Sequence, residues 1–253
     1  MKKDIKYLTG KKSSNVPITM VTAYDFPTAQ IIDGAGIDSI LVGDSVGTNC
    51  LGLTSEREVT ISDMLHHTKA VRRGVNKAFL IVDLPYGCAD TLEAAIENSQ
   101  LLTEAGADCV KIEGWGEKAD IIRGVCGNGY KVCAHIGYNP QIHDKPAVFG
   151  KDTNQAKELL DSALLLEKAG ASLIVLEMVP AELAEKISSA LKIPTIGIGS
   201  GNGCGGQVLV INDLLGISPK LFKHVRRFAN LRETLHNSFR EYASAVEKRE
   251  FPA

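Results

Sequence analysis

The sequence predicts a single domain over residues 1–253 with the (β/α)8 barrel (TIM barrel) fold of the α/β class. Three observations predict it. Eight short apolar runs alternate with helical patterns, the length of 253 residues suits one barrel, and a short pattern recurs where helices lead into strands. A doubly wound open sheet is the alternative. That fold usually has a glycine-rich phosphate fingerprint after its first strand, whereas this chain has Tyr24-Asp25-Phe26-Pro27.

The expected strands are near-continuous apolar runs, which suits parallel strands buried on both faces. They are Ile18–Thr22, Ser39–Val42, Ala78–Val82, Cys109–Ile112, Val132–Ile136, Leu173–Leu176, Thr195–Ile198 and Val208–Ile211. Between them, helical patterns cover Thr28–Gly34, Ile61–Arg73, Thr91–Ala105, Glu117–Val125, Asn154–Ala169 and Ala181–Leu191, and Ser218–Lys248 predicts one or two terminal helices. The recurring pattern is Ala35-Gly36-Ile37-Asp38, Ala105-Gly106-Ala107-Asp108 and Ala169-Gly170-Ala171-Ser172, and each interval leaves room for two βα units.

Composition excludes several classes of protein. Hydrophobic residues make up 44% and charged residues 23%, which argues against a disordered, collagenous or coiled-coil chain. The longest apolar run, Ala78–Val82, is far shorter than the roughly 18 residues of a membrane span. A net charge of −2 argues against nucleic-acid binding. The partners expected are therefore small molecules.

The cysteines and the N-terminus bear on location. The six cysteines include no C-x-x-C pair, so we expect free thiols rather than a zinc site. The first twelve residues hold five lysines and one aspartate, with no apolar stretch after them. We therefore expect a short solvated basic arm, not a targeting signal, and a cytoplasmic protein.

Three carboxylates follow three consecutive strands, at the end where a (β/α)8 barrel carries its active site. Asp44, Asp83 and Glu113 come after the second, third and fourth runs. Neighbouring strands lie about 4.8 Å apart, so these groups repel one another unless a cation lies among them. Oxygen ligands without a His/Cys cluster favour Mg²⁺. The alternative is that some of these acids only cap helices.

Three further polar residues lie at the same end. Lys111 precedes Glu113 by two residues and shares its side of the strand, so it is expected to bind a substrate carboxylate, or alternatively to form a structural salt bridge. Glu177 follows a purely apolar run, and partial desolvation would raise its pKa into the range of a general base; the alternative is a helix cap or a supporting acid. His135 is either structural or a donor to a substrate oxygen.

Two other segments carry weaker indications. Gly199-Ser200-Gly201-Asn202-Gly203 could cradle an anion or simply turn the chain. The basic stretch from Lys220 to Arg232 is expected to be an amphipathic helix, with either a solvated face or a positive rim for an acidic substrate. From the residues alone, the chain is interpreted as a Mg²⁺-dependent barrel enzyme that acts on a 2-oxo acid through an enolate.

Seven motifs follow one another along the chain. They are Val21-Thr22-Ala23-Tyr24-Asp25, Leu41-Val42-Gly43-Asp44-Ser45, Asp83-Leu84-Pro85, Val110-Lys111-Ile112-Glu113-Gly114, Cys133-Ala134-His135-Ile136-Gly137, Leu176-Glu177-Met178-Val179-Pro180 and Ile196-Gly197-Ile198-Gly199. In this order, over about residues 17–217, the motifs resemble the ketopantoate hydroxymethyltransferase (3-methyl-2-oxobutanoate hydroxymethyltransferase) family.

The resemblance implies a barrel of the phosphoenolpyruvate/pyruvate type. It implies transfer of a hydroxymethyl group from 5,10-methylenetetrahydrofolate to 3-methyl-2-oxobutanoate through a Mg²⁺-stabilised enolate, giving 2-dehydropantoate for pantothenate and coenzyme A. It also implies a homo-oligomer, commonly a decamer. The metal ligands would be Asp44, Asp83 and Glu113, the substrate-binding residues Asp44, Ser45, Asp83 and Lys111, and the catalytic residues Glu177, which removes the C3 proton, and His135.

The chain departs from the family pattern in three places. The family's glycine-rich lid loop after strand 5 is shorter here, over residues 138–152, and includes Gln141-Ile142-His143-Asp144-Lys145-Pro146. Gly205 replaces an aspartate before strand 8, and Asn212-Asp213 replaces His-Asp after it. Two alternative functions are therefore kept: another Mg²⁺-dependent 2-oxo-acid aldolase or lyase of the same barrel group, and a non-catalytic ligand-binding barrel.

Overall fold

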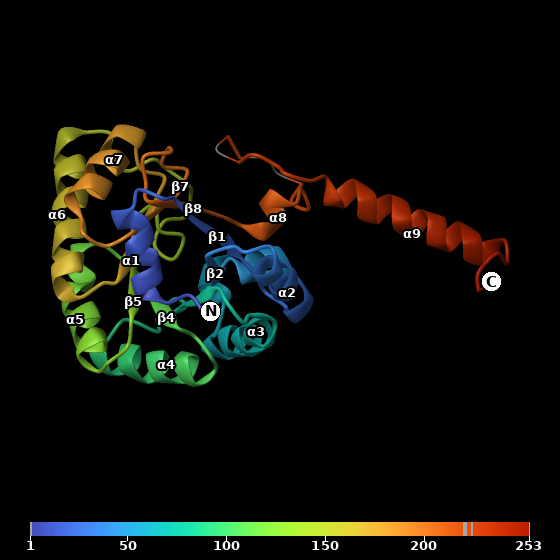
Figure 1. The fold of residues 1–253 in the computed structure, drawn as a ribbon, viewed down its shortest axis with the longest axis horizontal. Helices are drawn as coiled ribbons and strands as arrows, with labels where there is room; N and C mark the ends of the chain where they lie inside the picture. Colours follow the sequence, from blue (N-terminus) through green and yellow to red (C-terminus); the bar gives the residue numbers. More distant parts are fainter. Residues whose placement is uncertain (1, 220–221, 224, 253) are drawn as a thin grey trace. The chain divides into compact units, whose positions relative to one another are not determined.

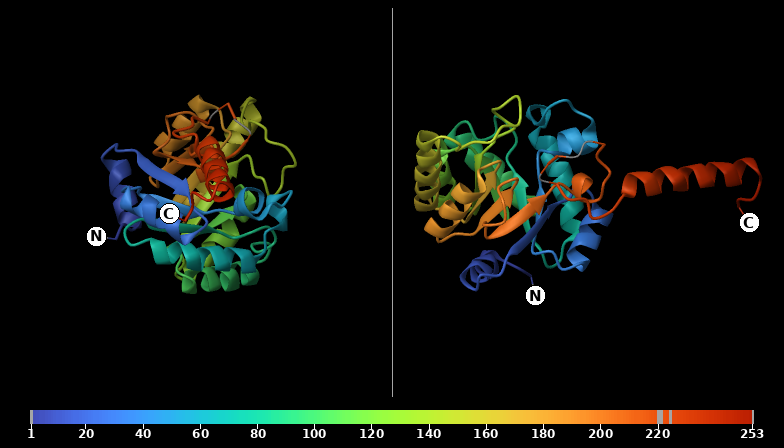
Figure 2. Two further views of the ribbon diagram at one scale, coloured as in Figure 1. Left: turned by 90° about the vertical axis from the view of Figure 1, so that its right-hand side faces the viewer. Right: turned by 90° about the horizontal axis from the view of Figure 1, so that it is seen from above.

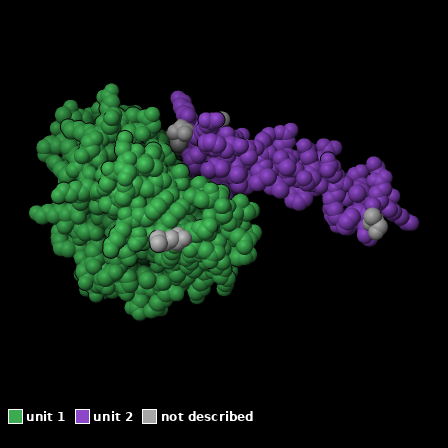
Figure 3. Space-filling view, viewed as in Figure 1, with its two compact units in different colours: residues 1–208 green, residues 209–253 purple. Residues whose placement is uncertain are grey.

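The structure is a computed structural model that describes residues 2–219, 222–223 and 225–252. The chain divides into two compact units, residues 1–208 and residues 209–253 (Figure 3). Each unit is described by itself below.

Eight parallel strands close into a barrel in chain order (Figure 1). The strands are β1 (Ile18–Thr22), β2 (Ser39–Val42), β3 (Phe79–Asp83), β4 (Cys109–Glu113), β5 (Val132–Gly137), β6 (Leu173–Glu177), β7 (Thr195–Ile198) and β8 (Gly206–Leu209). The predicted (β/α)8 fold is therefore confirmed. The sequence prediction for strand 8, Val208–Ile211, begins two residues too late. In fact a Cβ on Gly206 would lie 2.5 Å from the Ile18 carbonyl oxygen, so the closing strand needs glycine there.

Helices surround the strands, as the two further views in Figure 2 also show. The longer ones are α2 (Phe26–Gly34), α3 (Ile61–Gly74), α4 (Leu92–Glu104), α5 (Ala119–Gly127), α6 (Thr153–Ala169) and α7 (Ala181–Ala190), and the short ones are η1 (Gly47–Leu51), η2 (Glu56–Glu58) and η3 (Gly116–Lys118). The six longer helices match the predicted patterns to within two residues at either end. Among the residues described, no helix combines the length and the apolar composition needed to cross a bilayer.

The recurring sequence pattern marks where the chain turns from a helix into a strand. Gly36, Gly106 and Gly170 all have positive φ, of 85°, 115° and 109°, a conformation that glycine adopts without steric cost. In the first two of these turns, the aspartate that follows connects the turn to the preceding strand of the barrel. The carboxylate of Asp38 accepts from Thr19 N at 2.9 Å, and that of Asp108 accepts from Leu80 N at 3.0 Å.

The N-terminal segment corrects one expectation. Residues 5–13 form helix α1 (Ile5–Ser13), whereas a solvated arm was predicted. Leu8 is fully buried and belongs to the cluster of apolar side chains that fills the barrel, together with residues such as Ile18 and Phe79. The lysines remain compatible with this packing because two of them, Lys3 and Lys11, pair with Asp38. The helix thus contributes to the core despite its basic composition.

Along β3, β4, β5 and β6, the side chains inside the barrel change from apolar to polar. Phe79, Ile81, Cys109, Cys133 and Val175 belong to the apolar cluster. Two residues further along β3, β4, β5 and β6, on the same side of each strand, are Asp83, Lys111, His135 and Glu177. The strand register places these polar residues at neighbouring positions, with Asp83 beside Lys111 and Glu113 beside His135.

The second unit contains α8 (Ile211–Leu214) and α9 (Leu231–Glu247). A helix was predicted from Lys220 to Arg232. Residues 220, 221 and 224 lie outside the described residues, and 222–223 and 225–230 are not helical, so this expectation is wrong for the residues described before α9. Backbone amides of Phe228 and Leu231 donate to the carbonyls of Leu214 and Leu215 instead, which folds this segment back onto α8.

Candidate active site

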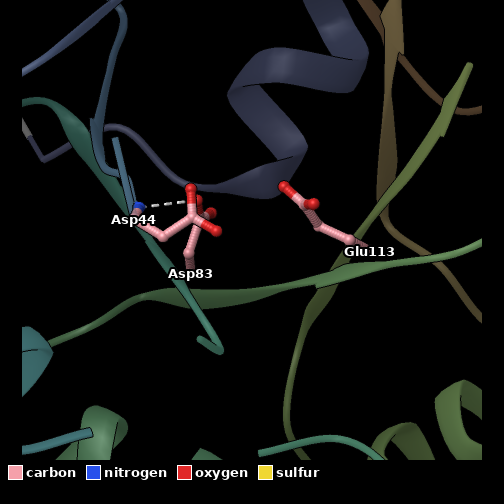
Figure 4. A group of neighbouring side chains, drawn as sticks. All are labelled: Asp44, Asp83 and Glu113. Carbon is pink, nitrogen blue, oxygen red and sulfur yellow. Dashed lines mark hydrogen bonds between the residues drawn. The ribbon is translucent and has the colours of Figure 1, made fainter. Parts of the chain in front are cut away.

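The three predicted carboxylates meet at the carboxyl ends of the strands. Asp44 lies in the turn after β2, and Asp83 and Glu113 are the last residues of β3 and β4. All three are buried, and each offers an oxygen within 4.8 Å of the other two. Asp44 and Asp83 lie side by side with Glu113 facing them, and the backbone N–H of Asp44 donates to Asp83 Oδ2 at 3.1 Å (Figure 4).

Lys111 supplies a single positive charge to this cluster. Its Nζ lies 2.9 Å from Asp83 Oδ2 and 2.6 Å from Glu113 Oε1, and its side chain is 5% exposed. When all three carboxylates are ionised, they and the one ammonium have a net charge of −2, which a divalent cation would balance. Burying such an imbalance away from water is costly without a counter-ion.

Unpartnered oxygens give an independent test of whether a metal fits. Among the described residues, Asp83 Oδ1 and Glu113 Oε2 are buried without a hydrogen-bond partner. Buried polar atoms are nearly always paired, so each of these oxygens is available to a ligand. Hard carboxylate oxygens are what Mg²⁺ prefers. The residues present therefore fit a divalent metal.

The pKa values of the carboxyl groups show how the buried charges affect one another. Burial, reinforced by the negative charges of Glu113 and Asp83, raises the pKa of Asp44 well above its usual value. Burial also disfavours ionised Glu113, but the Lys111 ammonium and His135 hold the pKa of that carboxyl well below its usual range. A cation among the three groups would relieve the repulsion felt by Asp44.

His135 and Glu177 lie next to the carboxylate cluster. His135 Nδ1 is 3.0 Å from Glu113 Oε1, and its Nε2 is 3.5 Å from Glu177 Oε2. Burial raises the pKa of Glu177 to about 7, an effect that His135 opposes and Glu113 reinforces. A carboxylate with this pKa is ionised for part of the time at neutral pH and still basic enough to accept a proton from carbon.

A tight contact between two strands fixes the position of Glu177. Gly137 has φ of 98°, and a Cβ there would lie 2.1 Å from the backbone oxygen of Glu177. Tyr138 N donates to that same oxygen at 2.9 Å. Met178, the next residue, has φ of 51°, a left-handed conformation that is unfavourable for a side chain of this kind. The backbone around the proposed base is thus strained and closely packed.

The remaining predicted segments have visible structural roles. Ser45 is partly buried, and its Oγ lies 2.8 Å from the hydroxyl of the buried Tyr24. In the glycine-rich loop, Ser200 Oγ donates to the Leu176 carbonyl and accepts from Val179 N. A Cβ on Gly201 would meet Ala181 of α7 at 2.5 Å, so this loop needs glycine for packing.

Two residues that the sequence does not single out also contribute to the site, one through contact with Asp44 and the other by holding the loop that carries the first. Gln141, from the short loop after β5, donates from Nε2 to Asp44 Oδ2 at 2.8 Å. Arg57, from η2, donates to the backbone oxygens of Gln141 and Ile142 at 2.9 and 2.6 Å. The only sequence signal was the departure of this loop from the family pattern, which says nothing about what the loop touches.

Comparison with known proteins identifies the family of this chain. A family model described as ketopantoate hydroxymethyltransferase matches residues 2–253. The chain belongs to the ketopantoate hydroxymethyltransferase family. It is therefore an enzyme of the family that the sequence motifs resemble, and the transferase class predicted for it is confirmed.

Relatives agree with this membership. Proteins named 3-methyl-2-oxobutanoate hydroxymethyltransferase from Geobacillus sp. (strain WCH70) and Deinococcus radiodurans are 44% and 45% identical to this chain. The first alignment covers 95% of this chain and 88% of the relative, and the second covers 95% and 87%. A relative of the same name from Clostridium novyi is 41% identical, and the alignment covers 100% of this chain and 94% of the relative.

Solved structures share the fold at low identity. A phosphonopyruvate hydrolase in complex with oxalate and Mg²⁺ superposes with a TM-score of 0.68 at 14% identity, covering 100% of this chain and 90% of the other. A 2,3-dimethylmalate lyase, a member of the PEP mutase/isocitrate lyase superfamily, gives 0.63 at 15% identity with the same coverage. The predicted relation to barrels of the phosphoenolpyruvate type is confirmed at the level of the fold.

Proposed function

We propose that this enzyme transfers a hydroxymethyl group from 5,10-methylenetetrahydrofolate to C3 of 3-methyl-2-oxobutanoate and so forms 2-dehydropantoate. Water supplies the hydroxyl oxygen, and tetrahydrofolate is released. The observation that carries the proposal is a buried carboxylate cluster with an excess of negative charge, next to a carboxylate whose pKa is about 7. Family membership supplies the substrates, which the geometry alone does not identify.

The proposed metal ligands are Asp44, Asp83 and Glu113, whose oxygens converge and are in part unpartnered. When bound, Mg²⁺ would polarise the 2-oxo group of the substrate and stabilise the negative charge that develops as the C3 proton leaves. Lys111, a buried ammonium, would share its charge with the substrate carboxylate. Ser45, oriented by the Tyr24 hydroxyl, would donate a hydrogen bond to the same group.

The proposed base is Glu177. It would take the proton from C3, and the electron pair of the broken C–H bond would then form the new bond to the methylene carbon of the folate. The two C–N bonds of that carbon would break, one replaced by this C–C bond and the other by a bond to the oxygen of water. The C3 proton and one proton of the water would end on the two nitrogens of the released tetrahydrofolate. If His135 donates from Nδ1 to Glu113, its Nε2 carries a lone pair that faces Glu177 Oε2 at 3.5 Å. His135 would thus accept a hydrogen bond from Glu177 once that carboxyl holds the proton.

The proposal is tested by the dependence of product formation on the donor and on the metal. With Mg²⁺, 3-methyl-2-oxobutanoate and 5,10-methylenetetrahydrofolate, 2-dehydropantoate should appear, and a chelator should stop it. Asp83→Asn should abolish the reaction, whereas Asp90→Asn, at an acid beyond the same strand whose side chain is 68% exposed, should leave it unchanged. Enolisation without this product would favour another 2-oxo-acid lyase or aldolase, and metal binding without enolisation a ligand-binding barrel.

Assembly and location stay predictions. We propose a homo-oligomer, a decamer by resemblance. The support comes from α9, all of whose residues the structure describes. None of them is buried, although Leu235, Phe239, Tyr242 and Val246 form an apolar stripe along one face of the helix. Such an exposed apolar face is typical of a surface that contacts another chain. Light scattering coupled to size-exclusion chromatography measures the assembly, and cell fractionation tests the cytoplasmic location.

A further inference from the structure

The loop after β5 differs from the family pattern, and its contacts give it a role. Gln141 is 9% exposed, and its amide nitrogen donates both to Asp44 Oδ2 at 2.8 Å and to the Leu84 carbonyl at 3.2 Å. The Leu84 carbonyl directly follows Asp83 in the chain. One amide group therefore bridges the segments that carry two of the three proposed metal ligands.

Asp44 needs such support more than the other ligands do. Asp83 and Glu113 end strands, and Lys111 holds both of their carboxylates. Asp44 instead lies in a turn beyond β2, and the Gln141 amide holds its Oδ2. An amide can orient a carboxylate without cancelling its charge, so the full negative charge stays available to a cation.

Arg57 in turn holds the loop. Its Nε and Nη2 donate to the backbone oxygens of Gln141 and Ile142, and its Nη1 pairs with Asp144 at 3.0 Å. Within the loop, Asn139 Oδ1 accepts from Gln141 N at 2.8 Å. The hydrogen bonds of Arg57 and Asn139 fix the backbone from which the Gln141 side chain reaches the site, and those of Arg57 join the chain after β2 to the chain after β5. The exposed ion pair to Asp144 adds little to this.

We propose that Gln141 is a positioning residue for the Asp44 metal ligand and that Arg57 keeps Gln141 in place, so that this pair sets the metal affinity of the site. This proposal depends on the proposed function, because that function places a divalent metal at the site. Groups that orient metal ligands typically change metal affinity by about 10–100-fold when removed. The short loop thus has a defined task, separate from closing over substrate.

The test measures Mn²⁺ binding by calorimetry on the full chain without substrate, with Mn²⁺ standing in for Mg²⁺ at oxygen ligands. Gln141→Met keeps the length of the side chain and removes its donors, and we expect its Kd to rise about 10–100-fold. Gln141→Asn, too short to reach Asp44, should weaken binding in the same way and serves if the Met variant does not fold. Arg57→Leu should shift the Kd in the same direction.

The matched control is Asp144→Asn, which removes only the ion pair to Arg57. Asp144 is 85% exposed, so we expect its Mn²⁺ affinity to stay within about twofold of wild type. Saturating metal should restore turnover in the Gln141 variants, which loss of folded protein would not allow. A Kd in Gln141→Met that is unchanged or tighter would overturn the proposal, and an unchanged Kd in Arg57→Leu would overturn the part played by Arg57.

The same titration separates this proposal from the proposed function. If wild type binds Mn²⁺ and Asp83→Asn does not, the metal site stands and only the Gln141 and Arg57 variants decide the further inference. If wild type itself binds no divalent metal, the metal site and the positioning role are both overturned.

Discussion

Replacing Glu177 by Gln should abolish turnover and yet stabilise the protein in alkaline solution. Burial raises the pKa of this carboxyl from 4.5 to about 7. Between these two values the folded protein keeps the proton while the unfolded chain loses it. The stability associated with Glu177 is therefore complete below about pH 4.5 and is lost as the pH rises through 7. Glutamine does not titrate and loses nothing over this range.

The size of the effect follows from the same shift. One pKa unit corresponds to about 1.4 kcal/mol, so a shift from 4.5 to about 7 corresponds to about 3.5 kcal/mol. This is an upper bound because the side chain is 22% exposed. Most of the change falls between about pH 5 and pH 8. Whatever the substitution costs in packing is common to both pH values and cancels from the difference.

The assay is urea unfolding of wild type and Glu177→Gln at pH 5 and pH 8, at one protein concentration and with a chelator present. The charged groups that act on Glu177, namely His135, Glu113, Lys111 and Glu56, are the same in both proteins. Glu182→Gln, at an exposed acid in the first turn of α7, is the matched control. Between the two pH values, the free energy of unfolding of Glu177→Gln should rise relative to that of wild type by up to about 2.5 kcal/mol.

A difference that does not change with pH would refute the claim that Glu177 is desolvated. A difference that falls as the pH rises would show that the pKa is lowered instead. In metal-loaded wild type, protonation of Glu177 should make kcat/KM fall about tenfold for each pH unit below pH 7, because the base must be ionised to act.

Other predictions concern the packing around the site. Lys111→Met leaves buried carboxylates unpaired and should cost about 3–5 kcal/mol in urea unfolding without metal, and less with Mg²⁺. Gly137→Ala should lower kcat/KM about 100-fold by displacing Glu177, whereas Gly129→Ala, at a similar φ of 90° in open space, should not. Leu8→Ala should cost about 2–5 kcal/mol in urea unfolding without changing metal affinity, and no loss would contradict the core role of α1.

The barrel was predictable because its pattern is local. Most strands are near-continuous apolar runs that are followed by a polar residue or glycine, so their carboxyl ends can be located in the sequence. Asp83, Glu113, His135 and Glu177 could be chosen for this reason, and the structure brings them together with Asp44 and Lys111. The alternation of strands with helices and the topology of the barrel are enough to place these residues at one end, without knowledge of side-chain geometry.

The parts that escaped prediction depend on contacts between distant segments. Helix α1 is basic and only weakly amphipathic, and the burial of Leu8 requires an open barrel end above it. The role of Gln141 depends on a contact with Asp44, 97 residues away, and on Arg57 holding the loop. The start of β8 depends on how closely Gly206 approaches Ile18. None of these relations leaves a periodic trace in the sequence.

The central claim is that Glu177 removes the C3 proton of a 2-oxo acid beside a divalent metal. The most direct measurement is NMR of 3-methyl-2-oxobutanoate in D₂O with the enzyme and Mg²⁺, in the absence of folate, following loss of the C3 proton signal. We predict exchange that requires Mg²⁺ and disappears in Glu177→Gln but persists in Glu182→Gln. Exchange that continues unchanged in Glu177→Gln, or no exchange in folded, metal-loaded wild type, would contradict the account.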